Sequence, residues 1–257
     1  MAAVVIVFVV LASSAPPAAA GPDQLAPASL ISQVTGLRTQ VVSSIGAGDV
    51  PDPAQTARGS PPLLTGAGGR PELLFVGADY CPYCAAERWS VVIALSRFGS
   101  FSNLHITTSD SNPADIPDTH TFSFYGAGYA SSHLDLVAVE TADRNGNALQ
   151  TPSAAEQKLM GIYDTAPYSS QTDGIPFLDL GNRFIVSGSG VNPQLLQGMT
   201  WQQIAATFSD PQSQIAQQIV GNANWLTAAI CEVSGDQPGT VCGMAPIASL
   251  ESQLPRS

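Results

Sequence analysis

Positive charge is scarce in this sequence. Its 257 residues include 9 Lys and Arg against 20 Asp and Glu, which gives a net charge of −11, and charged residues make up only 11% of the chain. The few cations form no cluster. A nucleic-acid-binding protein needs a basic face that neutralises phosphates, so we predict no nucleic-acid partner. Anionic membrane headgroups would also repel such a surface.

Metal-ligating side chains are few as well. The chain has 4 Cys and 3 His. Structural zinc usually takes four Cys or His ligands, commonly as two closely spaced pairs. His105, His120 and His133 have no paired spacing, and the C-terminal cysteines, Cys231 and Cys242, lie far apart for a zinc knuckle. We therefore expect no metal site, and the chemistry inferred below needs no organic cofactor.

The sequence also lacks an apolar run long enough to cross a bilayer, which takes about 20 residues. The N-terminal run Ala2–Leu11 is shorter, is followed by Pro16 and Pro17, and ends near the small residues 18–20. This pattern predicts a secretory signal peptide or an anchor in residues 1–20. No Lys or Arg precedes the run, which is a departure from the usual signal. We expect an extracytoplasmic protein, secreted or tethered to the membrane by this segment.

The four cysteines fall into two pairs. Four cysteines allow three connectivities, but the short separations favour Cys81 with Cys84 and Cys231 with Cys242. Disulfides persist outside the cytosol. The second pair follows the last predicted helix and encloses Gly and Pro, so we predict a structural disulfide that ties down a C-terminal tail at residues 233–257. Closing a loop of that size contributes about 3 kcal/mol in the chain-entropy model.

Hydrophobic periodicity divides the rest of the chain. Residues 21–69 are predicted to be a linker with one amphipathic helix, and residues 70–232 form the main domain. The helix rests on apolar residues at helical spacing: Leu30, Val34, Leu37, Val41 and Ile45. In the main domain the patterns predict strands at 72–77, 104–108, 121–125 and 134–139, a hairpin over 176–186, and helices at 85–98, 153–163, 200–208 and 211–231.

The tetrapeptide Cys-Pro-Tyr-Cys at residues 81–84 carries the strongest functional signal. It stands between a predicted buried strand and a predicted helix. A cysteine at a helix N-terminus has its thiolate stabilised by unpaired backbone N–H groups and by the helix dipole, and the thiolate is the nucleophile in disulfide exchange. We therefore expect Cys81 to be the exposed attacking sulfur and Cys84, more buried, to be the resolving sulfur. Pro82 helps to start the helix, and Tyr83 lies beside Cys81, where it could tune access.

This tetrapeptide is identical to the one common in glutaredoxins, and the order strand, CxxC, helix, Ile-Pro hairpin, helix resembles the thioredoxin superfamily. The resemblance implies an α/β fold class: a thioredoxin-like three-layer fold in which helices flank a central mixed sheet. In such folds a cis proline opens the later hairpin against the CxxC pair, and the preceding residue offers its backbone to an extended substrate. By this resemblance Ile175 and Pro176, with Tyr83, would position the substrate. The dipeptide alone also allows an ordinary trans proline at a strand start.

A longer resemblance covers roughly residues 60–232. It rests on three stretches, PPLLTGAGGRPELLFVGADYCPYCAAERWSVVIALSRFGSFSNL, then TFSF, then GIPFLDLGNRF. These are similar to a bacterial and archaeal family of exported or membrane-anchored proteins catalogued as a domain of unknown function. The resemblance implies a thioredoxin-like fold and no particular substrate.

Two features depart from the thioredoxin pattern. Thioredoxins keep a buried Asp six residues before the first cysteine, and that position here is Phe75. Glu87, one helical turn after Cys84, or Asp79 would have to act as proton partner instead. The insertion at about 109–165, between the CxxC half and the cis-Pro half, is also larger than in a minimal thioredoxin. It would form either a substrate-binding cap or scaffold.

Two functions follow from these observations. The first is an exported thiol–disulfide oxidoreductase, whose partners would be exported cysteine-containing proteins and a membrane redox protein that resets the dithiol. The second is a non-catalytic thioredoxin-fold binding or envelope module in which Cys81 and Cys84 form an inert disulfide. A disulfide across a two-residue gap would stabilise the fold only slightly, because closing so short a loop removes little conformational entropy from the unfolded chain. We therefore favour the redox function.

Overall fold

The structure, a computed structural model, describes residues 24–112, 116–170 and 172–255. The signal or anchor segment predicted at 1–20 lies outside the described residues. The fold is α/β, and its centre is the buried apolar strand β3 (Glu72–Gly77), which leads directly into the Cys81–Cys84 segment.

β3 lies inside a mixed five-stranded sheet with the order β2-β10-β9-β3-β8. On one side it runs parallel to β8 (Asp135–Glu140), with Phe75 opposite Ala138. On the other side it runs antiparallel to β9 (Phe177–Leu180), which forms a hairpin with β10 (Phe184–Ser187). The short strand β2 (Gln55–Thr56) closes the far edge.

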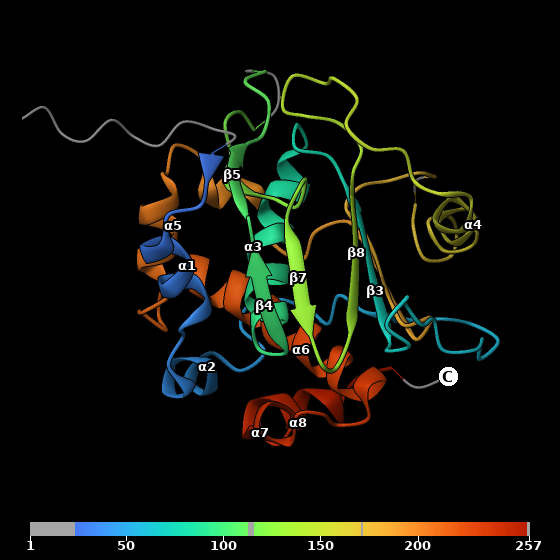
Figure 1. The fold of residues 1–257 in the computed structure, drawn as a ribbon. Coiled ribbons are helices and arrows are strands. Elements are labelled where there is room, and N and C mark those ends of the chain that lie inside the picture. Colours follow the sequence, from blue (N-terminus) through green and yellow to red (C-terminus); the bar gives the residue numbers. More distant parts are fainter. Residues whose placement is uncertain (1–23, 113–115, 171, 256–257) are drawn as a thin grey trace, which may run out of the picture.

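Alternate residues of these strands pack on opposite faces of the sheet. Leu73 and Phe75 belong to the larger apolar core, whereas Leu74 and Val76 belong to a smaller one. The smaller core is covered by α4 (Ala154–Tyr163), which lies alone on one side of the sheet in Figure 1. The larger core is covered by α3 (Pro82–Ser96) and α6 (Gln214–Ser234), which pack against each other. Helices thus cover both faces.

Two smaller sheets contain the strands between α3 and β8, and one of them also takes in an N-terminal strand. One pairs β1 (Gln24–Leu25), β5 (His105–Thr108) and β6 (His120–Ser123), and the other pairs β4 (Gly99–Ser102) with β7 (Gly128–Ser131). The strand predicted at 104–108 therefore forms, but not beside β3.

The place beside β3 is taken by β8, which the sequence analysis assigned to the insertion at about 109–165. That insertion is therefore not one separate unit. β8 pairs with β3 over all six of its residues, from Glu72 with Asp135 to Gly77 with Glu140. The chain consequently leaves the central sheet twice, before β8 and after it.

The single amphipathic helix predicted in residues 21–69 is wrong in one respect, because two helices form: α1 (Ala28–Thr35) and α2 (Thr39–Ile45). The break follows Gly36, whose N–H bonds to the Ser32 carbonyl as α1 ends. This segment is also no linker. The side chains at the predicted apolar positions 30, 34, 41 and 45 are buried in the larger core.

The C-terminal segment differs from a tail in the same way. A disulfide joins Cys231 at the end of α6 to Cys242, the last residue of α7 (Gly239–Cys242). The chain then forms α8 (Ala245–Glu251), and Ile247 and Leu250 are buried against the larger core. Residues 233–255 are thus part of the packed fold.

The remaining elements follow the β9–β10 hairpin. They are the 3₁₀ helix η1 (Pro193–Leu196) and α5 (Trp201–Thr207), which begins with a capping box between Thr200 and Gln203. Across the described part of the chain, every helix is too short or too polar to span a bilayer.

Candidate active site

The two cysteines of the tetrapeptide lie at the N-terminus of α3. Cys81 is the N-cap residue with an extended backbone, and Pro82 occupies the first turn. The N–H of Cys84 points at Cys81 Sγ with an N···S distance of 3.4 Å, so this sulfur accepts a hydrogen bond of the kind an N-cap side chain takes. Both cysteines are free thiols in the structure. A sulfur held there receives unpaired N–H groups and the positive end of the helix dipole.

The two sulfurs differ in exposure less than the sequence suggests. Cys84 is fully buried, as expected, but Cys81 is only 7% exposed and is therefore not the open side chain that we predicted. The reason is the neighbouring loop before β9, where the Ile175 carbonyl oxygen lies 3.8 Å from Cys81 Sγ and accepts its S–H.

The two thiols differ in acidity, because their pKa values are shifted in opposite directions. The pKa of Cys81 is lowered from 9.0 to about 7, chiefly by the hydrogen bond from the Cys84 side chain; burial opposes this and the backbone N–H groups of Cys84 and Tyr83 assist it. The pKa of Cys84 is raised well above its ordinary value, first by burial and then by its neighbour Cys81. Near neutral pH one sulfur is therefore partly thiolate while the other keeps its proton, which suits a nucleophile and its resolving partner.

A buried ion cluster lies under the dithiol. Arg88, on α3 one turn after Cys84, is fully buried and donates to both carboxylate oxygens of Glu140 at 2.8 and 2.5 Å. Asp79 Oδ1 lies 3.4 Å from the same guanidinium. The positive charge of Arg88 lowers the pKa of both thiols. The cluster joins α3, the end of β8 and the loop before Cys81.

Sequence analysis did not find Arg88 or Glu140. The available signal was a cation in a helix that is otherwise largely apolar or small, apart from the adjacent Glu87, in a chain with only 9 cations. Its partner lies 52 residues away, so the sequence gave no sign of the pair. The other predicted candidate, Asp79, does lie in this cluster and accepts a hydrogen bond from Ser123 Oγ at 3.1 Å.

Glu87, predicted as a possible proton partner, faces away from the sulfurs. Its buried carboxylate accepts from Asn222 Nδ2 at 2.9 and 3.0 Å, from Ser189 Oγ at 3.1 Å and from the Gly190 N–H at 3.0 Å. Burial raises its pKa, and these donors oppose the rise. The side chain therefore ties α3 to α6 and to the loop after β10. No hydrogen bond within the described residues joins it to a cysteine.

The predicted substrate-positioning residues lie beside Cys81. The Ile175–Pro176 peptide bond is cis, and the Pro176 carbonyl accepts from the Gly188 N–H at 2.8 Å. Ile175 is half-buried, and among the described residues no hydrogen bond uses its N–H group. Tyr83 is 51% exposed. These positioning residues come from two segments, 175–176 and the Cys81–Cys84 motif, which meet where the Ile175 carbonyl contacts Cys81 Sγ.

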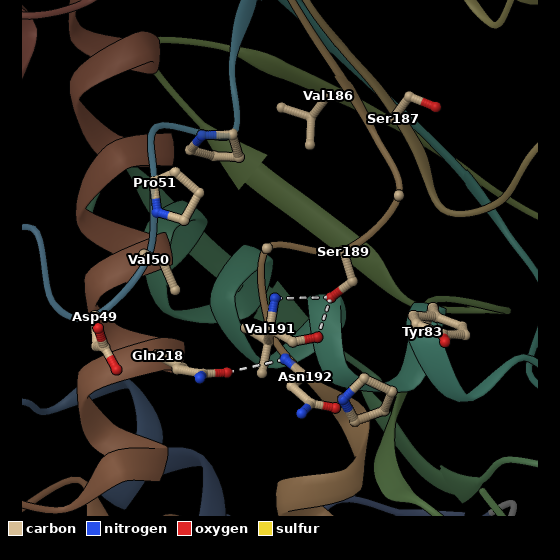
Figure 2. A pocket seen from close by; sticks show the side chains of 14 residues that line it. Asp49, Val50, Pro51, Tyr83, Val186, Ser187, Ser189, Val191, Asn192 and Gln218 are labelled. Atoms are coloured by element: carbon tan, nitrogen blue, oxygen red, sulfur yellow. Dashed lines mark hydrogen bonds between the residues drawn. The ribbon is translucent and has the colours of Figure 1, made fainter. Parts of the chain in front are cut away.

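Two cavities adjoin this region. Figure 2 shows the first, of 470 Å³, between Tyr83, residues 49–53 and the loop 186–193. The second, of 370 Å³, is lined by Asp79 together with His105, Ser123 and Tyr125, among others. Tyr125, in the lining of the second cavity, is 46% exposed, and Tyr80, next to Cys81 in the chain, is 38% exposed.

Within the described part of the chain, no group of three or more His, Cys, Asp or Glu side chains is arranged to hold a metal ion. The fold and the site thus define an α/β protein with a dithiol of split acidity at a helix N-terminus. Residues 64–232, more than half of the chain, match the DUF929 family, described as a domain of unknown function. The chain belongs to that family. No curated protein and no solved structure matches it significantly.

Proposed function

We propose that this protein is an exported thiol–disulfide oxidoreductase with a thioredoxin-like fold, exchanging disulfides with cysteines of other extracytoplasmic proteins. The observation that carries the proposal is the position of Cys81 at the N-cap of α3, where its sulfur accepts the Cys84 N–H and contacts the Ile175 carbonyl; the lowered pKa of Cys81 and the raised pKa of Cys84 agree with it. An inert pair would not need one sulfur poised to ionise near neutral pH.

The strand arrangement supports the fold part of the proposal. A thioredoxin-like domain has a strand followed by the CxxC helix, a parallel neighbour strand, and an antiparallel hairpin on the other side. Here β3, α3, β8 and the β9–β10 hairpin stand in those relations. The residues between α3 and β8, and between β8 and β9, would then be additions to this frame.

The exchange takes two steps. The Cys81 thiolate attacks a substrate disulfide, forms a mixed disulfide with one substrate sulfur and releases the other as a thiolate. Cys84 then loses its proton and attacks Cys81, which closes the Cys81–Cys84 disulfide and releases the second substrate thiolate. The substrate disulfide gains two electrons and the protein dithiol loses two, and the reverse sequence oxidises a substrate dithiol. A membrane redox partner would restore the starting state.

The N–H of Ile175, which has no hydrogen-bond partner among the described residues, supports a polypeptide as substrate. A backbone N–H at the edge of the site can pair with an extended strand, as in other β-addition modes of peptide recognition. Because Ile175 O lies 3.8 Å from Cys81 Sγ, a strand paired with this residue would bring its own cysteine next to the nucleophile.

Export is supported by the N-terminal apolar segment in the sequence and by the Cys231–Cys242 disulfide, since structural disulfides are typical of oxidising compartments.

Trapping tests the proposal. A Cys84→Ser variant cannot resolve a mixed disulfide, so we expect it to accumulate covalent adducts with a disulfide-bonded test protein, detected on non-reducing gels. The matched control, Cys81→Ser, should form none because Cys84 is fully buried. Equal adduct formation by both variants, or none by Cys84→Ser, would count against the proposal.

One observation favours the alternative, a non-catalytic binding module: Cys81 is only 7% exposed. Rates of alkylation separate the two functions. An enzyme should react with iodoacetamide at pH 7 clearly faster than a free cysteine does, whereas a module with an occluded thiol should react more slowly.

A further inference from the structure

The cavity beside Tyr83 begins at the proposed reaction centre. Tyr83 lies two residues after Cys81, and on the other side the Gly188 N–H bonds to the Pro176 carbonyl next to Ile175. The residues that flank a target cysteine would therefore enter this cavity first. In Figure 2 it extends from Tyr83 across the loop 187–192 to Asp49 on the opposite side.

The walls of this cavity are held in place from behind. Glu87 and Asn222 fix Ser189 and Gly190, and Gln218 Oε1 accepts the Asn192 N–H at 2.9 Å. The Ser189 hydroxyl also bonds to both backbone groups of Val191. A wall fixed before binding loses little conformational entropy when a ligand enters. Glu87, which does not reach the sulfurs, therefore holds the wall of this cavity in place.

The lining combines aliphatic surface with negative charge. Its apolar members are Val50, Pro51, Pro53, Val186, Val191 and Pro193. Asp49 is the charged residue of the lining and is exposed, with no ion pair among the described residues. Neither this cavity nor the one beside Asp79 is lined by a Lys or Arg. A ligand with carboxylates, such as glutathione, would find no cation there.

A lysine or arginine side chain matches this lining, because it buries an aliphatic stem while its charged head reaches water and a carboxylate. The net charge of −11 also attracts cationic segments at long range. We propose that the cavity between Tyr83 and Asp49 is a subsite for a lysine or arginine side chain near the target cysteine of a polypeptide substrate. This inference rests on the exchange activity proposed above.

Matched peptides test the subsite. A single cysteine, carried as its thionitrobenzoate mixed disulfide, is flanked at successive positions by Lys, Gln or Glu. Release of the chromophore gives the second-order rate constant with the reduced protein. Each rate is divided by that of the thionitrobenzoate derivative of free cysteine amide with the same variant, which removes differences in thiol reactivity. We expect a Lys peptide to react about 2- to 5-fold faster than its Gln counterpart at low salt, as one exposed ion pair allows.

Two charge-matched variants locate the effect. Asp49→Asn and Asp210→Asn each remove one exposed negative charge, and Asp210 lies outside the cavity lining. We expect Asp49→Asn to abolish the preference for Lys over Gln and Asp210→Asn to retain it. The same preference in both variants, or no preference in the unmodified protein, overturns the subsite. If even the cysteine amide derivative reacts no faster than with a free thiol, the exchange activity itself fails.

Discussion

At the residue scale, the two cysteines lie three positions apart at the start of α3 and differ in their surroundings. Cys81 accepts hydrogen bonds from Cys84 and from backbone N–H groups, whereas Cys84 is enclosed by apolar residues such as Phe75. The buried Arg88 adds positive charge under both sulfurs. Thiolate character at Cys81 is therefore a property of α3 and its neighbours together.

The first prediction concerns the pH dependence of Cys81. Its pKa lies near 7 instead of 9.0, so the thiolate fraction should rise through pH 7. We expect the rate of iodoacetamide alkylation of the reduced protein to increase with a midpoint near pH 7. The Cys81→Ser variant should react slowly at this pH, because the pKa of Cys84 is raised by burial. A midpoint near the ordinary thiol value of about 8.5 would contradict the split acidity.

The second prediction concerns Arg88 and Glu140. Either single change, Arg88→Gln or Glu140→Gln, breaks the buried Arg88–Glu140 pair and unbalances the charges of the cluster, so it should lower the free energy of unfolding by about 3–5 kcal/mol. The double variant removes both charges and should lose less than the sum of the two. Urea unfolding of the four proteins measures this coupling.

The double variant also separates structure from redox chemistry. Because it removes the cation that acts on the sulfurs, its alkylation midpoint should lie above that of the unmodified protein. An unchanged midpoint would mean that Arg88 is purely structural.

Single residues were predictable where the chemistry is local in sequence. The Cys81–Cys84 pair and its place before a helix follow from a contiguous motif, and Ile175 and Pro176 from a hairpin signal. Arg88 with Glu140, and Glu87 with Asn222, were not predictable, because their partners lie 52 and 135 residues away. Hydrophobic periodicity cannot detect such pairs, since it describes which face a residue occupies and not what it meets there.

At the scale of helices and strands, local sequence patterns predicted the positions of the elements well. They predicted less well which strands pair with one another. The strand at 104–108 exists as β5, yet it pairs with β1 and β6 instead of β3. Both β5 and β8 are short strands, and neither sequence alone identifies the sheet that the strand joins. Pairing depends on the long segment between them, whose path the sequence pattern does not fix.

The break between the two N-terminal helices, in contrast, leaves a signal in the local sequence. The apolar spacing over residues 30–45 fits one helix, but Gly36 interrupts it, and a Cβ there would lie 2.5 Å from the Ser32 carbonyl oxygen. A glycine inside a helical pattern is a recognised warning of a helix end. The break could have been predicted from that residue.

The third prediction belongs to the C-terminal helices. The Cys231–Cys242 disulfide closes a short loop between α6 and α7. Removing it by Cys231→Ala with Cys242→Ala should lower the free energy of unfolding by about 2–4 kcal/mol, because the unfolded chain gains freedom. Thermal or urea unfolding measures this loss. The matched control, Cys81→Ala with Cys84→Ala, removes two free thiols and no cross-link, so it should lose less.

At the scale of the whole molecule, buried acids shape the response to pH. The pKa of Asp179 is raised by burial to about 7, and that of Asp164 to about 6, each from 3.8. Between pH 4 and 7 the folded protein therefore holds protons that the unfolded chain releases. Stability falls as pH rises through this range, since the folded state is then the one that binds more protons.

The fourth prediction follows from Asp179. We expect unfolding by urea to require more denaturant at pH 5 than at pH 7.5. Asp179→Asn should flatten that dependence and raise the free energy of unfolding at pH 7.5 by about 2–4 kcal/mol, because a buried charge is removed. The amide oxygen introduced by the Asp179→Asn change can still accept the hydrogen bond from the Asn182 N–H. The exposed control, Asp210→Asn, should leave the slope with pH in place, and an equal flattening there would point to net charge instead.

The burial of α3 has a consequence for electron transfer. Every residue from Cys84 to Leu95 is buried, and hydrogen bonds join the helix to β6, at Ala85 and Trp89, and to α6, at Ser90. We therefore expect the helix to stay in place if the proposed exchange oxidises the dithiol, with changes limited to rotation of the Cys81 side chain and release of the Ile175 carbonyl. Oxidised and reduced forms should superimpose nearly everywhere else, so that the speed of the proposed exchange would be set by how a partner reaches the sulfur.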